Sequence, residues 1–555
     1  MLDDIAGWAG AAGERNWSVG NARIRVIAGV LPVLAVTLAM ALPTLWYPYG
    51  RDQGQYAYFA RQWRDGNAPY RDLWDQKPPG FYLIIMLLQE MLGTGMHVQR
   101  VGDLAAAAGI ALLLWLLARR LGGSIARGAG LAAACCFPIV YFGGFIYWDT
   151  AQPEIWLSLF ATAAVVSITG PPSLPRTALS FGLLAAAVLV KLPAAVLAPF
   201  LAVMLWLRLA ERPPMLLAKH LGAAAGGMLG PAVAVAALVL RHHDAWRNMV
   251  EILLRYNAYY VMAKAGEVTM LDLVWQPLSF QLEAPATVLL YLLGLAVGVR
   301  LLSRTAWRTV LLWCAGSFLV LLVQKKYYLY HYVVLLPPVC YLVGLGVAWL
   351  GFLLHRFAAG GGSDLGRAGR RATAGLSAAG LCLLFTWGQV RPFYTGYLDR
   401  WWDLVSGRMG HFRFYSQFGG PDGYEYISNS MIARFLRWNA GPADFLAVQG
   451  FEPALYELTG LSCPSRFYST FPLMDPKLSA FRPEWRHEYR TSLSQSHPRW
   501  IVTAGAPPLW LPDLYRKVEA HHRLEVWMAT APDAPPPVLR RLGDAPPPHV
   551  RHMVE

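Results

Sequence analysis

Apolar runs long enough to cross a lipid bilayer recur through the first 390 residues, and this feature limits the fold of the chain most strongly. A helix of about 20 apolar residues spans a hydrocarbon core about 30 Å thick. The first run, 26–46, contains no charged residue and is too long for the apolar core of a signal peptide. Of the 555 residues, 55% are hydrophobic and only 15% are charged. The chain is therefore predicted to be a polytopic α-helical membrane protein.

Lysine and arginine are concentrated in alternate short breaks between the apolar runs, as the positive-inside rule requires for cytoplasmic loops. The N-terminus is therefore predicted to be cytoplasmic and the C-terminal part external. The largely apolar stretch 81–92 is too short to span, and is predicted to form a re-entrant or interfacial helix. The eleven predicted spans are approximately 26–46, 98–118, 127–147, 151–169, 177–190, 192–210, 219–240, 285–302, 307–323, 331–354 and 372–390.

This topology can be tested with reporter fusions. A periplasm-active reporter fused after residue 391 is expected to be active, and one fused between residues 357 and 370 is expected to be inactive, because arginines are concentrated before the last predicted span, at Arg356, Arg367, Arg370 and Arg371. The reverse pattern would contradict the predicted orientation.

Long external segments usually carry function, so the external face is predicted to be the working face. We expect a transmembrane catalytic domain over 1–390, with 47–97 as its first external loop, and an external α/β domain over 391–555. In the second domain, apolar runs of strand length alternate with helical patterns. These runs and patterns lie at 427–438, 445–448, 453–458, 500–502 and 524–528.

The net charge of +14 could indicate binding to nucleic acid. Most lysines and arginines of the first 400 residues lie in the short breaks, however, which favours topology signals and contacts with anionic membrane lipids. Nucleic acid is therefore not an expected partner. None of the six cysteines forms a CxxC pair or a zinc-type Cys/His cluster, so disulfides and a structural metal are not expected.

In the first external loop, an acidic residue opens a helical pattern and a basic residue follows it. Asp52 opens this pattern and Lys77 begins a Lys-Pro-Pro sequence. Between them, one helical face is formed by Tyr56, Phe59, Ala60 and Trp63. A helix with this face would lie in the membrane interface, with Asp52 at its start.

At these residues the chain resembles the GT-C membrane glycosyltransferases, in the branch that holds protein O-mannosyltransferases and lipid A aminoarabinose transferases. That branch has an acidic motif after the first span and a Lys-Pro-Pro-like motif about 25 residues later. The family usually has two consecutive acids, whereas this chain has Asp52-Gln53. The second carboxylate does not carry over, which argues against a two-carboxylate cation site; dependence on a divalent cation is left open.

The resemblance continues along most of the chain, and the order of the motifs is more specific than any one of them. The C-terminal motifs resemble those of rhizobial-type galacturonosyltransferases. The further matching sequences are Gln152-Pro153-Glu154, Leu189-Val190-Lys191-Leu192-Pro193, Lys325-Lys326-Tyr327-Tyr328, Tyr330-His331-Tyr332, Leu336-Pro337-Pro338, Gln449-Gly450-Phe451-Glu452-Pro453 and Ser465-Arg466-Phe467.

The resemblance implies inverting transfer of a sugar from a polyprenyl-phosphate donor at a bacterial inner membrane. The acceptor would be a lipid-linked glycan, lipopolysaccharide or lipid A, or a protein. A phosphate leaving group needs cations, and an acceptor hydroxyl needs a carboxylate to take its proton. The catalytic carboxylates are predicted to be Asp52 and Glu154. The donor phosphate is predicted to contact Lys77, Lys191, Lys325, Lys326 and His331, and substrate to contact Arg51, Tyr56 and Tyr332.

Most of these residues also have a purely structural interpretation. Asp52 with Gln55 fits a helix capping box, and Glu154 after a proline fits the helix dipole. A lysine at the end of a span often extends to the membrane surface without further function, and His331 fits an interfacial polar residue. The tyrosines fit an aromatic belt.

Three other functions remain open from the sequence. A transporter or flippase for lipid-linked sugars would need ionisable residues near the middle of the membrane, and the predicted spans have few. A polymerase or ligase of surface polysaccharide would use a similar donor, and the loop from Asp52 to Lys77 favours the transferase. No feature of the sequence favours the third function, an assembly scaffold.

Overall fold

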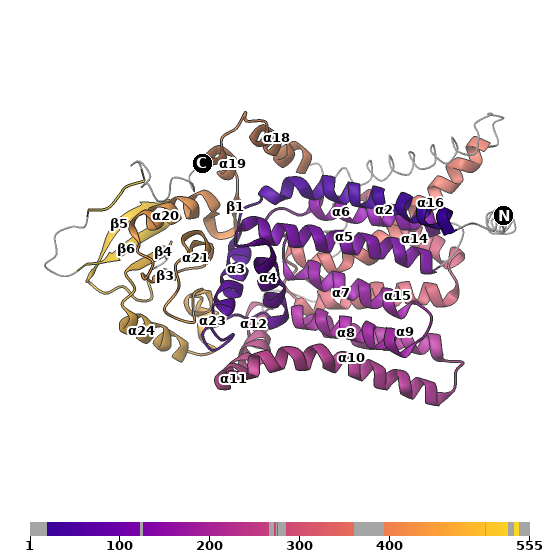
Figure 1. The fold of residues 1–555 in the computed structure, drawn as a ribbon, viewed down its shortest axis with the longest axis horizontal. Coiled ribbons are helices and arrows are strands. Elements are labelled where there is room, and N and C mark those ends of the chain that lie inside the picture. Colours follow the sequence, from indigo (N-terminus) through magenta and orange to yellow (C-terminus); the bar gives the residue numbers. More distant parts are fainter. Residues whose placement is uncertain are drawn as a thin grey trace. The chain divides into compact units, whose positions relative to one another are not determined.

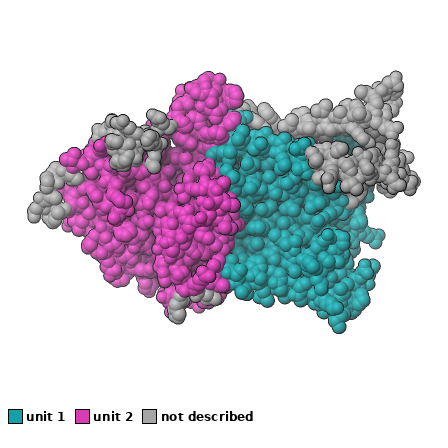
Figure 2. Space-filling view, viewed as in Figure 1, with its two compact units in different colours: residues 1–45, 100–235, 267–399 teal, residues 46–99, 236–266, 400–555 magenta. Residues whose placement is uncertain are grey.

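The structure is a computed structural model. It describes residues 19–121, 126–265, 271–272, 275, 285–359, 393–505, 507–530 and 538–542. The predicted span 372–390 lies outside the described residues. The chain divides into two compact units, which are coloured separately in Figure 2. Unit 1 comprises 1–45, 100–235 and 267–399, and unit 2 comprises 46–99, 236–266 and 400–555. The predicted boundary at residue 390 separates a transmembrane part from an external part of the chain. It concerns position relative to the membrane, and it stays a prediction.

Helices occupy all ten predicted spans that fall on described residues (Figure 1). They are α2 (Val19–Ala41) with η1 (Leu42–Trp46), α5 (Met96–Leu121), α6 (Ala126–Gly144), α7 (Pro153–Ile168), α8 (Leu174–Val190), η2 (Leu192–Val196) with α9 (Leu197–Leu209), α10 (Pro214–Leu240), α14 (Pro285–Leu301), α15 (Arg304–Gln324), and η4 (Leu329–Leu335) with α16 (Leu336–Ala359).

Six of these helical segments, in the described part of the chain, are long and apolar enough to cross a membrane. The other four are apolar helices of 16 to 19 residues. The largely helical architecture is confirmed, and the number of spans stays a prediction. Glycines let these helices approach closely: a Cβ on Gly294 of α14 would meet the backbone of Leu342 in α16, and one on Gly344 of α16 would meet Ala129 of α6. Small residues at such contacts are typical of membrane helix pairs.

The segment 47–97, predicted to be the first external loop, forms two helices in unit 2, α3 (Arg51–Arg64) and α4 (Pro79–Leu92). The predicted helix at 81–92 is therefore confirmed. Between the predicted spans 219–240 and 285–302, the described residues form α11 (His243–Val250), the π-helix η3 (Glu251–Tyr256) and α12 (Asn257–Ala265).

The predicted α/β character of the C-terminal part is confirmed by a four-stranded sheet in the order β3-β4-β6-β5. β3 (Leu446–Gln449) runs parallel to β4 (Trp500–Ala504), while β6 (Leu524–Ala529) and β5 (Tyr515–His521) add to it in antiparallel pairs. The remaining elements of this part are η5 (Phe393–Leu398), α18 (Asp399–Val405), α19 (His411–Tyr415), β1 (Gly419–Gly420), η6 (Pro421–Gly423), β2 (Tyr424–Glu425), α20 (Tyr426–Asn439), α21 (Ala454–Thr459), α22 (Phe471–Met474), α23 (Pro476–Ser479) and α24 (Glu484–Ser496).

The aromatic face of α3 is covered by protein, and the prediction that it faces the membrane interface is wrong. Tyr56 and Phe59 are fully buried. The ring of Phe59 stacks on Tyr82 of α4 with centroids 3.8 Å apart, and Tyr56 meets Phe81 of α4 edge to face at 4.7 Å. Aromatic pairs of this kind stabilise the fold beyond the effect of their buried area. The apolar face of α3 is therefore covered within unit 2.

The opposite side of α3 packs against α21 through Gly54. A Cβ built on Gly54 would lie 2.5 Å from the Cα of Ala454, which is closer than real atoms approach. Gly54→Ala is therefore expected to destabilise unit 2 by about 1–3 kcal/mol through overpacking. Thermal unfolding of the purified protein measures this. Gly410→Ala is the matched control, because a Cβ there meets nothing within 4 Å. Equal melting temperatures for the two variants would contradict the close packing of α3 on α21.

Candidate functional site

The first turn of α7 carries a buried carboxylate. Gln152 is the N-cap and Pro153 occupies the first helical position, where no intrahelical N–H bond is lost. Glu154 follows, with no exposed surface. Its Oε1 accepts a hydrogen bond from Nζ of Lys191, the residue at which α8 ends. Because a buried charge is costly unless it is paired, this contact compensates both groups.

A histidine from η4 lies next to the same carboxylate. His331 Nε2 is 3.7 Å from Oε1 of Glu154, and the His331 side chain is 6% exposed. One turn further along α7, Ser158 donates a hydrogen bond of 3.2 Å to the carbonyl oxygen of Val333. This bond fastens η4 to α7, and it holds the imidazole near the acid.

Glu154, Lys191 and His331 therefore form one cluster within unit 1, here called the glutamate cluster. The Lys191 ammonium also lies 5.6 Å from the centre of the Tyr330 ring, within the range of a cation–π contact. Tyr332, predicted to contact substrate, is buried one residue after His331. The structure brings these predicted residues together from three segments of the chain, and their catalytic roles stay predictions.

Lys325 and Lys326 lie in the turn between α15 and η4. Lys325 has a φ of 55° and Tyr327 a φ of 46°, in the left-handed region that side chains rarely adopt. Such conformations cost roughly 1–3 kcal/mol each and persist where the surrounding structure holds them. Lys325 is exposed. The predicted contacts of both lysines with phosphate stay predictions.

In unit 2, Lys77 lies over an aromatic ring. Its Nζ is 4.6 Å from the centre of the buried Tyr56 ring, a cation–π contact. The backbone of Lys77 is held on both sides: its N–H donates to Asp75 Oδ1 at 3.0 Å, and its carbonyl oxygen accepts from the Tyr70 hydroxyl at 2.8 Å. Pro78 then caps α4. The lysine therefore extends from a fixed turn.

Asp75 is a further buried residue of this turn, and it is not among the residues predicted above. Its carboxylate is fully buried and also accepts hydrogen bonds from Gln55 of α3 and, at 3.1 Å, from the Tyr468 hydroxyl. Burial, and next the nearby Asp75 carboxylate, raises the pKa of Tyr468 well above its ordinary value, so this hydroxyl stays protonated and can donate. The position of Asp75, two residues before Lys77, is the signal that could have identified it.

Asp52 lies in the first turn of α3 and is half-buried. The capping-box interpretation is wrong, because Gly50 is the N-cap, no side chain caps this helix, and Gln55 instead donates to Asp75. An acid at this position still interacts favourably with the positive end of the helix dipole.

Arg51 is buried and tied into the C-terminal part of unit 2. Its Nη2 lies 2.9 Å from Glu452 Oε1, and Asn429 donates to Glu452 Oε2 at 3.0 Å. Burial raises the pKa of Glu452, while the Arg51 guanidinium acts to lower it. The pair is a structural link between α3 and the segment before α21, and a contact of Arg51 with substrate stays a prediction.

No protein-family model and no curated protein sequence matches the chain. The solved structures that are similar to it over nearly its whole length include two of ArnT from Cupriavidus metallidurans. The structure bound to undecaprenyl phosphate is 16% identical and has a TM-score of 0.55, with 94% of this chain and 100% of the ArnT chain covered. The apo structure is 15% identical and has a TM-score of 0.57, with 92% and 100% covered. The predicted GT-C fold is thereby confirmed.

Proposed function

We propose that this chain, with its GT-C fold, is a glycosyltransferase that moves a sugar from a polyprenyl-phosphate carrier to an acceptor at the external face of the membrane. The fold shared with ArnT, which has been solved with undecaprenyl phosphate bound, is the observation that carries this proposal. The acceptor class is a lipid-linked glycan, lipopolysaccharide or lipid A, or a protein. Dependence on a divalent cation is left open.

The proposed step is an inverting displacement. An acceptor oxygen attacks the anomeric carbon while the bond from that carbon to the phosphate oxygen breaks. The acceptor proton passes to a carboxylate, and the polyprenyl phosphate leaves with the bonding electrons. A positioned base contributes about 10²–10⁴-fold to such a step. We assign this role to Asp52, which is half-buried at the start of α3.

Lys77 is proposed to meet the charge that develops on the leaving phosphate. The cation–π contact with Tyr56 and the two backbone hydrogen bonds support this role, because a pre-positioned cation needs no rearrangement during the reaction. Asp75 is then a positioning residue: it touches no reacting atom and fixes the turn from which Lys77 extends.

The glutamate cluster is proposed to bind and orient substrate in unit 1. A buried acid that shares one oxygen with an ammonium and an imidazole can exchange partners when an anionic group enters. Lys191 and His331 could then bind phosphate while Glu154 orients a hydroxyl. Ionisable groups buried in helical membrane proteins are usually functional, which supports this assignment.

Mass spectrometry of cell-envelope glycolipids and glycoproteins tests the proposed function. Cells that express the protein are expected to carry a glycoconjugate that is one sugar residue heavier than in cells lacking the gene. Expression of the Asp52→Asn variant at the same level is the control, and it should restore little of the product. Identical envelope profiles with and without the gene would contradict a transferase.

A further inference from the structure

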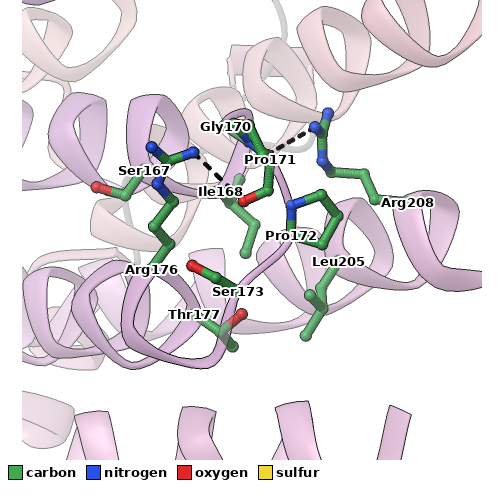
Figure 3. A pocket seen from close by; sticks show the side chains of 10 residues that line it. All are labelled: Ser167, Ile168, Gly170, Pro171, Pro172, Ser173, Arg176, Thr177, Leu205 and Arg208. Carbon is green, nitrogen blue, oxygen red and sulfur yellow. Dashed lines mark hydrogen bonds between the residues drawn. The ribbon is translucent and has the colours of Figure 1, made fainter. Parts of the chain in front are cut away.

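We infer that unit 1 binds the phosphate of an anionic phospholipid at the end of the helix bundle where α7 ends and α8 begins. Figure 3 shows the pocket at this place, around the backbone of Gly170, Pro171 and Pro172. Ser173, Arg176 and Thr177, from the start of α8, and Arg208, from the end of α9, also line it. The inference concerns lipid binding and is independent of the sugar-transfer proposal.

Three arginines from three helices converge on the last carbonyl groups of α7 and the turn after it. Arg120 of α5 donates to the carbonyl oxygen of Val166. Arg208 donates to that of Gly170 at 2.7 Å, and Arg176 to that of Pro171 at 3.3 Å. The negative end of a helix dipole corresponds to about half an elementary charge. The three guanidinium charges, less this half charge at the end of α7, therefore leave a net positive charge of roughly +2.5 at this place.

No carboxylate in the described part of the chain forms an ion pair with any of the three arginines, so the excess charge is not neutralised there. Each guanidinium carries five N–H donors and uses one of them on a carbonyl oxygen. The Nε of Arg208 is buried and has no hydrogen-bond partner among the described residues. A buried donor without a partner is costly, which indicates an acceptor supplied from outside the chain.

The side chains beside the pocket favour a lipid as the carrier of that acceptor. Leu179 of α8 and Val203 and Trp206 of α9 are 55%, 41% and 52% exposed. They lie on the same two helices that supply Arg176 and Arg208. Exposed apolar side chains suit acyl chains, and arginine forks suit phosphate oxygens. Basic pockets between membrane helices bind anionic headgroups in this way.

Gly170 allows a test that leaves the net charge unchanged. A Cβ built on Gly170 would lie 2.5 Å from Nη1 of Arg176, so Gly170→Ala must displace that guanidinium. Gly222→Ala is the matched control, because its Cβ would meet nothing within 4 Å. The second test variant is Arg176→Gln/Arg208→Gln. Its control is Arg300→Gln/Arg308→Gln, which removes the same amount of charge from exposed positions on α14 and α15.

Native mass spectrometry of the detergent-purified full chain measures the dissociation constants for phosphatidylglycerol and phosphatidylcholine. We expect the wild type to bind phosphatidylglycerol more tightly than phosphatidylcholine. Arg176→Gln/Arg208→Gln should weaken that binding about 25-fold, at about fivefold for each arginine. Gly170→Ala should weaken it severalfold, and both controls should match the wild type. Should the double variant fail to fold, Arg176→Gln alone, at an exposed side chain, carries the test with an expected loss of about fivefold.

Three outcomes would overturn the inference. The first is an equal loss in the Arg300→Gln/Arg308→Gln control, which would make the attraction a general charge effect. The second is equal binding by Gly170→Ala and Gly222→Ala. The third is displacement of the lipid by millimolar inorganic phosphate, which would identify a site for free anions.

Discussion

Replacing Asp52 by asparagine is expected to lower turnover about 100-fold or more, equivalent to about 2.7 kcal/mol or more of activation barrier. Asparagine keeps the size and shape of the side chain and removes the proton acceptor. Asp52 does not cap α3, so no capping bond is lost. The loss of its charge from the first turn should cost about 0.3–1 kcal/mol of stability. The measurement is turnover of the purified variant with its native donor, together with its melting temperature.

Asp65→Asn is the matched control for this variant. It is the same substitution on the same helix, at the C-cap of α3, where the side chain is exposed. We expect wild-type turnover for it. Stable Asp52→Asn protein with activity within a few-fold of wild type would remove Asp52 from the mechanism and leave Glu154 as the candidate carboxylate.

Lys77→Ala is expected to lower turnover by about 10²–10³-fold, the loss typical of removing one group that stabilises charge in a transition state. The substitution also removes the contact with the Tyr56 ring, which costs about 0.5–2 kcal/mol of stability. Lys77→Arg should recover only part of the activity, because a guanidinium presents its donors as a planar fork. Turnover and melting temperature are measured together, so that a loss of folding is recognised.

Lys517→Ala is the control for the removal of a lysine, since Lys517 pairs with Glu525 on the surface of the sheet. Surface pairs of this kind contribute little, so its turnover should be that of the wild type. Wild-type turnover by Lys77→Ala would contradict the proposed phosphate contact.

Local patterns predicted most of the elements of the fold. The helix α20 follows an amphipathic pattern, and the buried strands β3, β4 and β6 follow short apolar runs. The strand β5 was missed because its residues are mostly polar and partly exposed at the edge of the sheet. Such a strand carries little hydrophobic signal and is fixed by its pairing with β6.

The partners of the candidate residues could not be predicted from local patterns. Asp75 and Tyr468 are 393 positions apart, and only the packed structure of unit 2 brings them into contact. Lys191 was predicted to bind phosphate and Glu154 to act as a second acid, but nothing in the sequence indicated that they share a hydrogen bond. The aromatic face of α3 was recognised, whereas the rings of α4 that cover it were not.

Transfer of a sugar with release of its carrier distinguishes a transferase from a flippase. The direct measurement reconstitutes the purified protein in liposomes with a polyprenyl-phosphate sugar and an acceptor lipid, both extracted from the native membrane, and quantifies free polyprenyl phosphate by mass spectrometry. We expect one polyprenyl phosphate to be released for each acceptor glycosylated, and little release by Asp52→Asn. Intact donor moved to the opposite leaflet, with no polyprenyl phosphate released by the wild type, would contradict a transferase and identify a flippase.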